Sequence, residues 1–236
     1  MLRLEAVRSG YGKLEIIQSA SLEVPDRAIV GIIEPNGAGK STLLTTAFGY
    51  LVPSAGRIVL DGREIAGRRP DEIMRFGVGY LSQAGGLFAE MTVHDNLVLG
   101  GYTVSRAAKR QAIEEVYARF PIFRDRRHQL AGSLSGGEQR LLAIARALIV
   151  RPRLLLLDEP SAALAPRFID EVYATLEGLN RGGIALLIVE QNVEAILAVA
   201  HRVFVLDLGQ NAFDGTPAEL RASDRIRRLY LGEDAA

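Results

Sequence analysis

Short apolar runs recur along the chain, and each is closed by glycine, proline or polar residues. Residues 28–33 (AIVGII), 154–157 (LLLL), 184–189 (IALLIV) and 203–206 (VFVL) are the clearest of them. Such a run is typical of a strand in a parallel sheet, because both of its faces are covered and neither meets water. Helical segments separate these runs, and this alternation predicts an α/β fold with a doubly wound sheet.

The N-terminal part carries a second pattern, in which apolar and polar residues alternate. Residues 2–7 and 16–24 alternate as strands do, and residues 57–60 run into Asp61-Gly62, a pair that favours a hairpin turn. These segments predict antiparallel strands near one edge of the sheet. The same region also predicts helices over residues 40–50 and 70–76 and a strand over residues 78–82.

Residues 84–150 differ from both patterns and are mostly helical. Ser105 can cap a helix that runs to Arg119, and a strongly apolar helix follows over residues 137–150. We therefore predict one domain with a helical lobe inserted into an α/β core. The predicted domain is residues 1–236, its core is residues 1–83 and 151–236, and the lobe is residues 84–150.

Composition excludes several kinds of protein. The 236 residues include 28 Lys and Arg against 28 Asp and Glu, so no broad basic field favours nucleic acid, and we expect no nucleic-acid partner. Cysteine is absent, which excludes disulfides, thiolate metal sites and cysteine catalysis. The N-terminus does not resemble a signal peptide, and no apolar run approaches the ~18 residues of a membrane span. We expect a soluble, cytosolic chain that reaches a membrane only through another protein.

A glycine-rich segment follows the first buried strand. Residues 31–42 read GIIEPNGAGKST, close to the phosphate-binding pattern G-x-x-x-x-G-K-[ST]. Backbone N–H groups of residues 36–39 can converge on an anion, Lys40 can reach terminal phosphates, and the Ser41 hydroxyl can bind Mg²⁺. Glu34 stands where the pattern has its first glycine. A glycine turn with a solvated lysine is the alternative interpretation.

Two acids close the four-leucine run of LLLLDEP, residues 154–160. A buried parallel strand delivers such residues to its carboxyl end, where open α/β sheets bind ligands. Asp158 can hold Mg²⁺ through water, and Glu159 can orient and deprotonate an attacking water molecule. An apolar strand that ends in a polar turn is the alternative.

A second anion cradle is indicated by LSGGEQ, residues 134–139, in front of an apolar helix. Ser135 and the two glycines leave backbone N–H groups at a helix N-terminus. One nucleotide does not need two cradles, so this one makes sense if it closes over a nucleotide held by another subunit. A glycine turn with Glu138 as a first-turn acid is the alternative.

The order NGAGKST, LSGGE, LLLLDEP resembles the ATP-binding subunits of ABC transporters, and the likeness runs essentially end to end. It implies a P-loop NTPase core with an antiparallel edge subdomain and a helical subdomain. It also implies that two such chains sandwich two ATP molecules, each between the P-loop of one chain and the LSGGE segment of the other.

The resemblance also implies roles for single residues. Tyr11 falls where the family stacks an aromatic ring on adenine, Gln83 matches the glutamine that meets Mg²⁺ and the transmembrane partner, and Gln191 stands where most members carry a switch histidine. The implied catalytic residues are Glu159, Lys40 and Gln191. The implied ATP-binding residues are Tyr11, Glu34, Pro35, Asn36, Gly37, Ala38, Gly39, Lys40, Ser41, Thr42 and Gln83. Ser135, Gly136, Gly137 and Glu138 would bind the partner's ATP, and Ser41, Gln83 and Asp158 would bind Mg²⁺.

Longer segments narrow the resemblance to one branch of the family. LSQAGGLFAEMTVHDNL, DEPSAALAP, IVEQN and the ending IRRLYLG are similar to the second ATP-binding subunit of branched-chain amino acid transporters. Ala165 stands where most members carry an aspartate. The segment after Gln83 contains three apolar residues, Leu87, Phe88 and Met91. They would offer apolar surface to a permease loop, or else pack inside the lobe.

This branch implies an ATPase that powers an importer by ATP-driven dimer closure. Its partners would be transmembrane permeases, a second ATPase subunit of the same or a related sequence and, indirectly, a periplasmic or extracellular solute-binding protein. The chain would lie peripherally on the cytoplasmic face of the membrane. The alternatives are an amide or urea importer and a non-transport, regulatory ABC ATPase with impaired turnover, for which Glu34 is the main argument.

Overall fold

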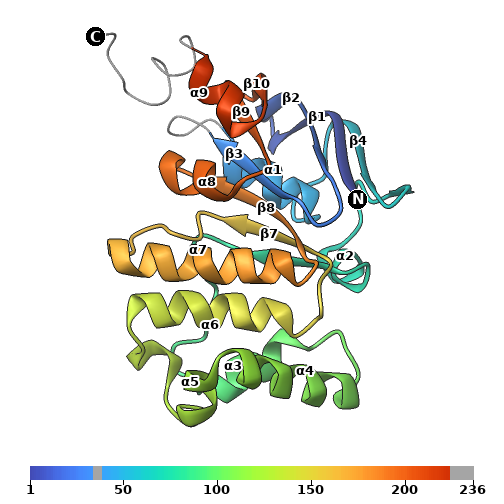
Figure 1. Cartoon of the computed structure of the whole chain (residues 1–236). Coiled ribbons are helices and arrows are strands. Elements are labelled where there is room, and N and C mark those ends of the chain that lie inside the picture. Colours follow the sequence, from blue (N-terminus) through green and yellow to red (C-terminus); the bar gives the residue numbers. More distant parts are fainter. Residues whose placement is uncertain (34–38, 224–236) are drawn as a thin grey trace.

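The computed structural model describes residues 1–33 and 39–223 (Figure 1). Five of the predicted nucleotide-binding residues and the IRRLYLG ending therefore lie outside the described part of the chain. The five are Glu34, Pro35, Asn36, Gly37 and Ala38.

The described strands form one mixed sheet. They are β1 (Leu2–Tyr11), β2 (Leu14–Val24), β3 (Ile29–Ile33), β4 (Ala55–Leu60), β5 (Arg63–Glu64), β6 (Val78–Leu81), β7 (Leu154–Asp158), β8 (Ala185–Glu190), β9 (Arg202–Asp207) and β10 (Gln210–Gly215). Their order across the sheet is β5-β4-β1-β2-β10-β9-β3-β8-β7-β6.

The centre of the sheet is parallel, as predicted. β3 pairs with β8 and β9, and β7 pairs with β8 and β6, all in parallel. Leu154 and Leu156 pack into the apolar cluster on one face, while Leu155 and Leu157 pack into the cluster on the other. Both faces of β7 are therefore buried, and this explains its uninterrupted run of leucines.

The predicted antiparallel edge is also confirmed. β1 pairs antiparallel with β2 and with β4, and β4 continues into β5 through a hairpin. The turn residues Asp61 (φ 50°) and Gly62 (φ 77°) both have positive φ, which a two-residue hairpin of the primed type requires. β10 pairs antiparallel with β9 and joins β2 to the parallel strands.

The helices cover the sheet in layers. They are α1 (Lys40–Ala47), α2 (Pro70–Arg75), α3 (Val93–Gly100), α4 (Arg106–Arg119), α5 (Pro121–Asp125), α6 (Gly136–Leu148), α7 (Pro166–Arg181), α8 (Val193–Val199) and α9 (Pro217–Ala222). In Figure 1, α7 and α6 lie below β7, and α3, α4 and α5 lie below α6. Ser105 caps α4 as predicted, since its hydroxyl accepts a hydrogen bond from the Ala108 N–H.

Some boundaries differ from those predicted. The helix expected over residues 40–50 ends at Ala47, because Gly49 takes a left-handed conformation (φ 86°) that stops a helix. The first strand runs on to Tyr11 rather than ending at residue 7, and Ala6 (φ 47°) marks an irregularity within it. The sequence patterns did not anticipate β10 or α9, and they gave no bounds for α3 and α5 within the predicted helical stretch.

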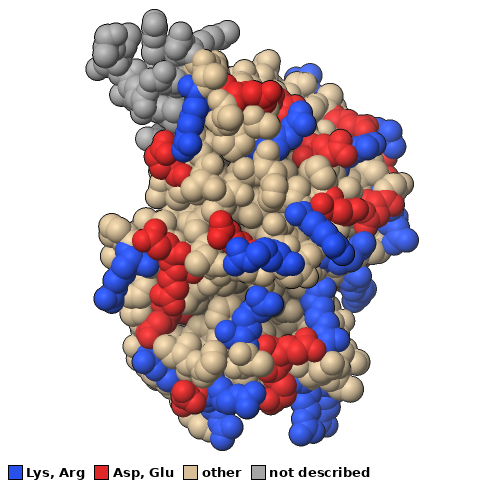
Figure 2. Space-filling view, in the orientation of Figure 1, with Lys and Arg blue, Asp and Glu red and all other residues tan. Residues whose placement is uncertain are grey.

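Charges of both signs are mixed over the surface. Figure 2 shows Lys and Arg interspersed with Asp and Glu over the face in view. Many are paired, as in Arg69–Asp71 (2.8 Å) and Arg153–Asp61 (2.6 Å). Opposite charges therefore cancel locally, in keeping with the formal net charge of zero.

Candidate active site

The first part of the site is the N-terminus of α1, the next element of the chain after β3. Gly39 has φ 128°, and a Cβ atom there would lie 2.6 Å from the Ile17 side chain, so the position requires glycine. Lys40 begins the helix and is 6% exposed. Thr42, the last predicted ligand of this segment, is also buried.

Ser41 and Asp158 meet at the end of β7. The Ser41 hydroxyl donates a hydrogen bond to Asp158 Oδ1 over 3.0 Å. Burial raises the pKa of the Asp158 carboxyl, and the Ser41 hydroxyl opposes that shift. Hydroxyl and carboxylate oxygens are ligands that Mg²⁺ accepts, so this pair fits the predicted magnesium site.

Within residues 1–33 and 39–223, no cluster of three or more His, Asp or Glu side chains is placed to hold a metal ion. Mg²⁺ in nucleotide sites keeps several waters and takes the rest of its ligands from phosphates. The Ser41–Asp158 pair is therefore suited to a cation that arrives with a nucleotide.

Glu159 is held by two amide side chains. Gln83 Nε2 donates to Glu159 Oε2 over 2.8 Å, and Gln191 Nε2 donates to Glu159 Oε1 over 2.6 Å. Glu159 has φ 47°, a costly conformation for a residue with a side chain, and its N–H donates to the Val189 carbonyl. The carboxyl ends of β6, β7 and β8 therefore converge on one buried carboxylate.

Tyr11 lies at the end of β1 and is 54% exposed. Its ring is thus available to a flat ligand at the surface, as the predicted adenine contact requires.

The LSGGE segment forms the start of α6. Ser135 caps the helix through a reciprocal pair of hydrogen bonds with Glu138: the Ser135 N–H donates to Glu138 Oε2 (2.9 Å), and the Glu138 N–H donates to the Ser135 hydroxyl (3.4 Å). The Ser135 N–H is the main cause of the lowered pKa of Glu138. Ser135 and Gly136 are exposed. Glu138 is thus occupied by the cap, and the exposed residues in front of it are those free to meet another molecule.

Sequence reasoning missed two charged residues near Glu159. Arg140, on α6, donates to the carbonyls of Ser82 (3.4 Å) and Gln83 (3.0 Å), and burial lowers its pKa. Glu190, at the end of β8, is 1% exposed. A polar residue closing an apolar run, as Asp158 closes β7, was the signal that could have drawn attention to Glu190.

Comparison with known proteins agrees with this geometry. Residues 17–162 match the family model described as ABC transporter. The chain is 39% identical to the high-affinity branched-chain amino acid transport ATP-binding protein BraG of Pseudomonas aeruginosa, over 98% of this chain and 100% of BraG. The chain belongs to the ABC transporter family. It is one of the ATPases of that family, and the predicted resemblance to branched-chain amino acid ATP-binding subunits is confirmed.

Two further likenesses extend over the whole chain of this ABC ATPase. It is 34% identical to the lipopolysaccharide export system ATP-binding protein LptB of Escherichia coli, over 99% of this chain and 98% of LptB. A solved nucleotide-free ATP-binding cassette from an ABC transporter superposes with a TM-score of 0.88 at 25% identity and 99% coverage of both chains. In the described part of this chain, no helix has the length and apolar character to cross a membrane.

Proposed function

We propose that this ABC ATPase powers an importer of branched-chain amino acids. The observation that carries ATP hydrolysis is the meeting of Ser41, Asp158 and Glu159 at the carboxyl edge of the sheet, beside the start of α1. The observation that favours the solute is the end-to-end similarity to BraG. The chain is also similar to LptB, which is named for lipopolysaccharide export. Membership of the family is therefore not enough to identify the transported solute.

The proposed chemistry assigns a step to each group. Backbone N–H groups at the start of α1, with Lys40, stabilise the charge on the β- and γ-phosphates of ATP. Ser41 and Asp158, with Gln83, would hold Mg²⁺, which neutralises phosphate charge when bound. Glu159 accepts a proton from the attacking water, which can bind to a lone pair that its two amide donors leave open.

Gln191 is the proposed switch residue. A glutamine amide can donate a hydrogen bond to the γ-phosphate as an imidazole can, but it does not titrate. In the structure its amide donates to Glu159 instead. We infer that Gln191 turns between Glu159 and the γ-phosphate, and that this exchange does not depend on a proton at the switch residue.

The second nucleotide site requires a second ATPase subunit. Ser135, Gly136, Gly137 and the N-terminus of α6 would close over ATP on that subunit's P-loop, and Ala165 would face the same ATP. In this proposal residues 84–150 form a lobe that carries the α6 cradle, and residues 1–83 and 151–236 form the core that carries the P-loop.

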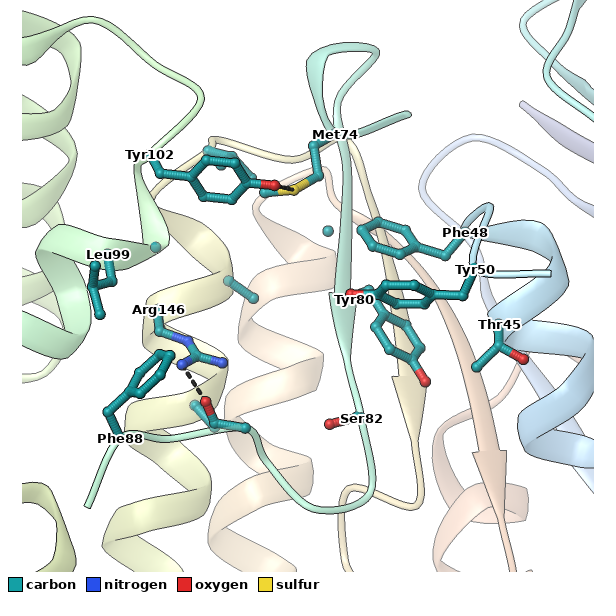
Figure 3. Close-up of a pocket in the computed structure, with 16 residues that line it drawn as sticks. Thr45, Phe48, Tyr50, Met74, Tyr80, Ser82, Phe88, Leu99, Tyr102 and Arg146 are labelled. Atoms are coloured by element: carbon teal, nitrogen blue, oxygen red, sulfur yellow. Dashed lines mark hydrogen bonds between the residues drawn. The ribbon is translucent and has the colours of Figure 1, made fainter. Parts of the chain in front are cut away.

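A groove between the α/β part and the helices is the proposed docking site for a permease. It has a volume of about 690 Å³ and lies between Phe48, Tyr50 and Tyr80 on one side and Phe88, Leu99 and Arg146 on the other (Figure 3). Tyr50, Phe88 and Tyr102 are more than half exposed. Exposed aromatic surface of this extent is typical of protein contact sites.

The segment after Gln83 has residues suited to each of the two predicted roles, which are contact with a permease and packing inside the helical lobe. Phe88 lines the groove, whereas Leu87 packs against the apolar core of the helices. Arg146 donates to the carbonyls of Gly85 and Gly86, and so ties this segment to α6. Docking at the groove would put the chain peripherally on the cytoplasmic face of the membrane, with the solute-binding protein on the far side of the permeases.

Uptake measurements test the proposed solute. Deletion of the gene should abolish high-affinity uptake of leucine, isoleucine and valine. Wild-type protein should restore it, and the Glu159→Gln protein, expressed at the same level, should not. Loss of amide or urea uptake with branched-chain uptake unchanged would contradict the proposal. Purified complex that binds ATP without turnover would favour the regulatory alternative.

A further inference from the structure

Glu190 is a buried carboxylate to which the proposed chemistry gives no role. It ends β8, directly before Gln191, and is 1% exposed. A buried carboxylate is costly unless hydrogen bonds replace its water. Its surroundings therefore require an explanation.

Backbone N–H groups from two separate loops supply those hydrogen bonds. The Ser161 N–H donates to Glu190 Oε1 over 2.9 Å. The N–H groups of Gln191 (3.1 Å) and Asn192 (3.3 Å) donate to Oε2. Ser161 belongs to the loop between β7 and α7, and Gln191 and Asn192 lie between β8 and α8. An ionised carboxylate accepts on both oxygens, so it can hold both loops at once.

A tyrosine hydroxyl from a third element faces the same carboxylate. Tyr173 lies on α7, the helix that follows the Ser161 loop, and its buried hydroxyl has no hydrogen-bond partner among the described residues. Burial, together with the neighbouring Glu190 carboxylate, raises the pKa of Tyr173. Tyr173 therefore stays protonated and adds no second negative charge beside Glu190.

The loop between β8 and α8 carries Gln191, the side chain that reaches the carboxylate of Glu159. Gln191 has its N–H on Glu190 Oε2 and its side-chain Nε2 on Glu159 Oε1. Glu159 and Ser161 in turn lie two residues apart after β7. Glu190 thus closes a ring. Hydrogen bonds join Glu190 to Ser161 and to Gln191 and join Gln191 to Glu159, and the backbone from Glu159 to Ser161 completes it.

We propose that Glu190 is a positioning residue that holds the Ser161 loop and Gln191 together. A displacement of the Ser161 loop is then transmitted to the Gln191 side chain, whose amide donates to Glu159. The proposal rests on the proposed function, in which Glu159 and Gln191 serve hydrolysis. Glu190 touches neither nucleotide nor water in this scheme, and it acts through Gln191.

The Glu190→Gln variant tests the proposal with a side chain of equal size. An amide places its NH₂ group opposite either the Ser161 N–H or the Gln191 and Asn192 N–H groups, so one loop is released. We expect kcat for ATP to fall roughly tenfold or more, because hydrogen bonds to a buried charge are lost, while KM for ATP changes less than about twofold. Glu194→Gln is the matched control, since Glu194 is an exposed acid on the neighbouring α8 and pairs with Arg221.

Two readouts separate positioning from general stabilisation. Amide hydrogen exchange in the Glu190→Gln protein should quicken at Ser161, Gln191 and Asn192 together, with β3 and β7 unchanged. In addition, Gln191→Ala should lower kcat no further in the Glu190→Gln protein than Glu190→Gln does alone. Independent, multiplicative losses would overturn the proposal, as would an unchanged kcat in Glu190→Gln.

A milder variant covers the case in which Glu190→Gln does not fold. Glu190→Asp keeps the carboxylate but shortens the side chain, so it cannot reach both loops at once, and it should lower kcat at least threefold with KM unchanged. An unchanged kcat in Glu190→Asp would then overturn the proposal. These assays use ATP hydrolysis by the purified transporter complex, so a failed prediction about the solute leaves them valid. Absence of hydrolysis in the wild-type complex would instead overturn the proposed function.

Discussion

At the scale of single residues, the state of Glu159 is the feature that bears most directly on activity. Both of its carboxylate oxygens accept hydrogen bonds, one from Gln83 and one from Gln191. Each carboxylate oxygen keeps a second lone pair, so a water molecule can still hydrogen-bond to Glu159. The two amides thus fix the orientation of the carboxylate that is proposed to act as the base.

Glu159→Gln is expected to bind ATP and to accumulate as ATP-bound dimers. The amide keeps the size of the side chain but removes the base, so hydrolysis should fall by roughly two or more orders of magnitude. Steady-state ATPase assays and size-exclusion chromatography with ATP measure the two effects. Wild-type turnover in this variant would contradict the role given to Glu159.

Glu34→Gly is expected to leave ATPase activity equal or higher, at a position outside the described residues. A carboxylate that points inward ~8 Å from a phosphate charge costs about 2 kcal/mol at an effective dielectric near 20, roughly thirty-fold in affinity. One that points to solvent costs only tenths of that energy, because water and salt screen it. We expect the outward arrangement. ATP affinity and kcat of both proteins check it, and a collapse of activity in Glu34→Gly would mean that Glu34 has a role of its own.

At the scale of elements, the contact between α6 and α7 explains one of the two glycines in LSGGE. A Cβ atom at Gly137 would lie 2.2 Å from the Phe168 ring on α7, whereas a Cβ atom at Gly136 would lie 3.9 Å from its nearest neighbour, Leu164. The second glycine thus allows two helices to approach closely. This requirement is structural and adds to any role in binding a phosphate.

Gly137→Ala is therefore expected to destabilise the chain by about 1–3 kcal/mol, since overpacking of a buried contact costs that much. Gly136→Ala is the matched control and should change the free energy of unfolding by less than about 0.5 kcal/mol. Denaturant unfolding of the two proteins measures both values. Adding Phe168→Leu should recover stability in Gly137→Ala, and equal stability of the two alanine variants would contradict the packing argument.

At the scale of the whole molecule, the proposed groove joins the nucleotide site to a permease. Tyr80 and Ser82 line it from β6 and the residue that follows, directly before Gln83. A segment docked there would lie within a few residues of the amide that holds Glu159. The groove is therefore placed to link docking to hydrolysis.

Phe88→Asp is expected to weaken co-purification of the chain with its permeases at least tenfold, because it places a charge in an apolar contact. Leu208→Asp is the matched control, since Leu208 is 71% exposed and does not line the groove. Quantitative pull-down with each variant measures the effect. Equal recovery of permease with both variants would exclude the groove as the docking site.

The assembled pair is expected to hydrolyse ATP at unequal rates at its two sites when the second subunit carries histidine and aspartate at the positions of Gln191 and Ala165. Gln191 would serve ATP on this chain's own P-loop, and Ala165 would face ATP on the partner. Single Glu→Gln substitutions, at Glu159 or at the corresponding partner residue, isolate each site. Equal losses of activity from the two substitutions would contradict inequivalence.

The sequence alone determined the kind of fold and the motifs of the site. Each motif is a continuous segment, and its local pattern states which element carries it: LLLL for a strand buried on both faces, or SGGE for a capped helix. Family resemblance then singled out Gln83 and Gln191. These features depend on neighbours along the chain, and a sequence displays such neighbours directly.

Only the tertiary structure decided which of these residues touch. Gln83 and Glu159 are 76 positions apart, and Gln191 and Glu159 are 32 apart, so their hydrogen bonds depend on β6, β7 and β8 lying side by side. Glu190 gained its importance from a loop 29 positions away. Strand order and close approach are properties of the packed chain, because they arise from burial shared among distant segments, and no local pattern encodes them.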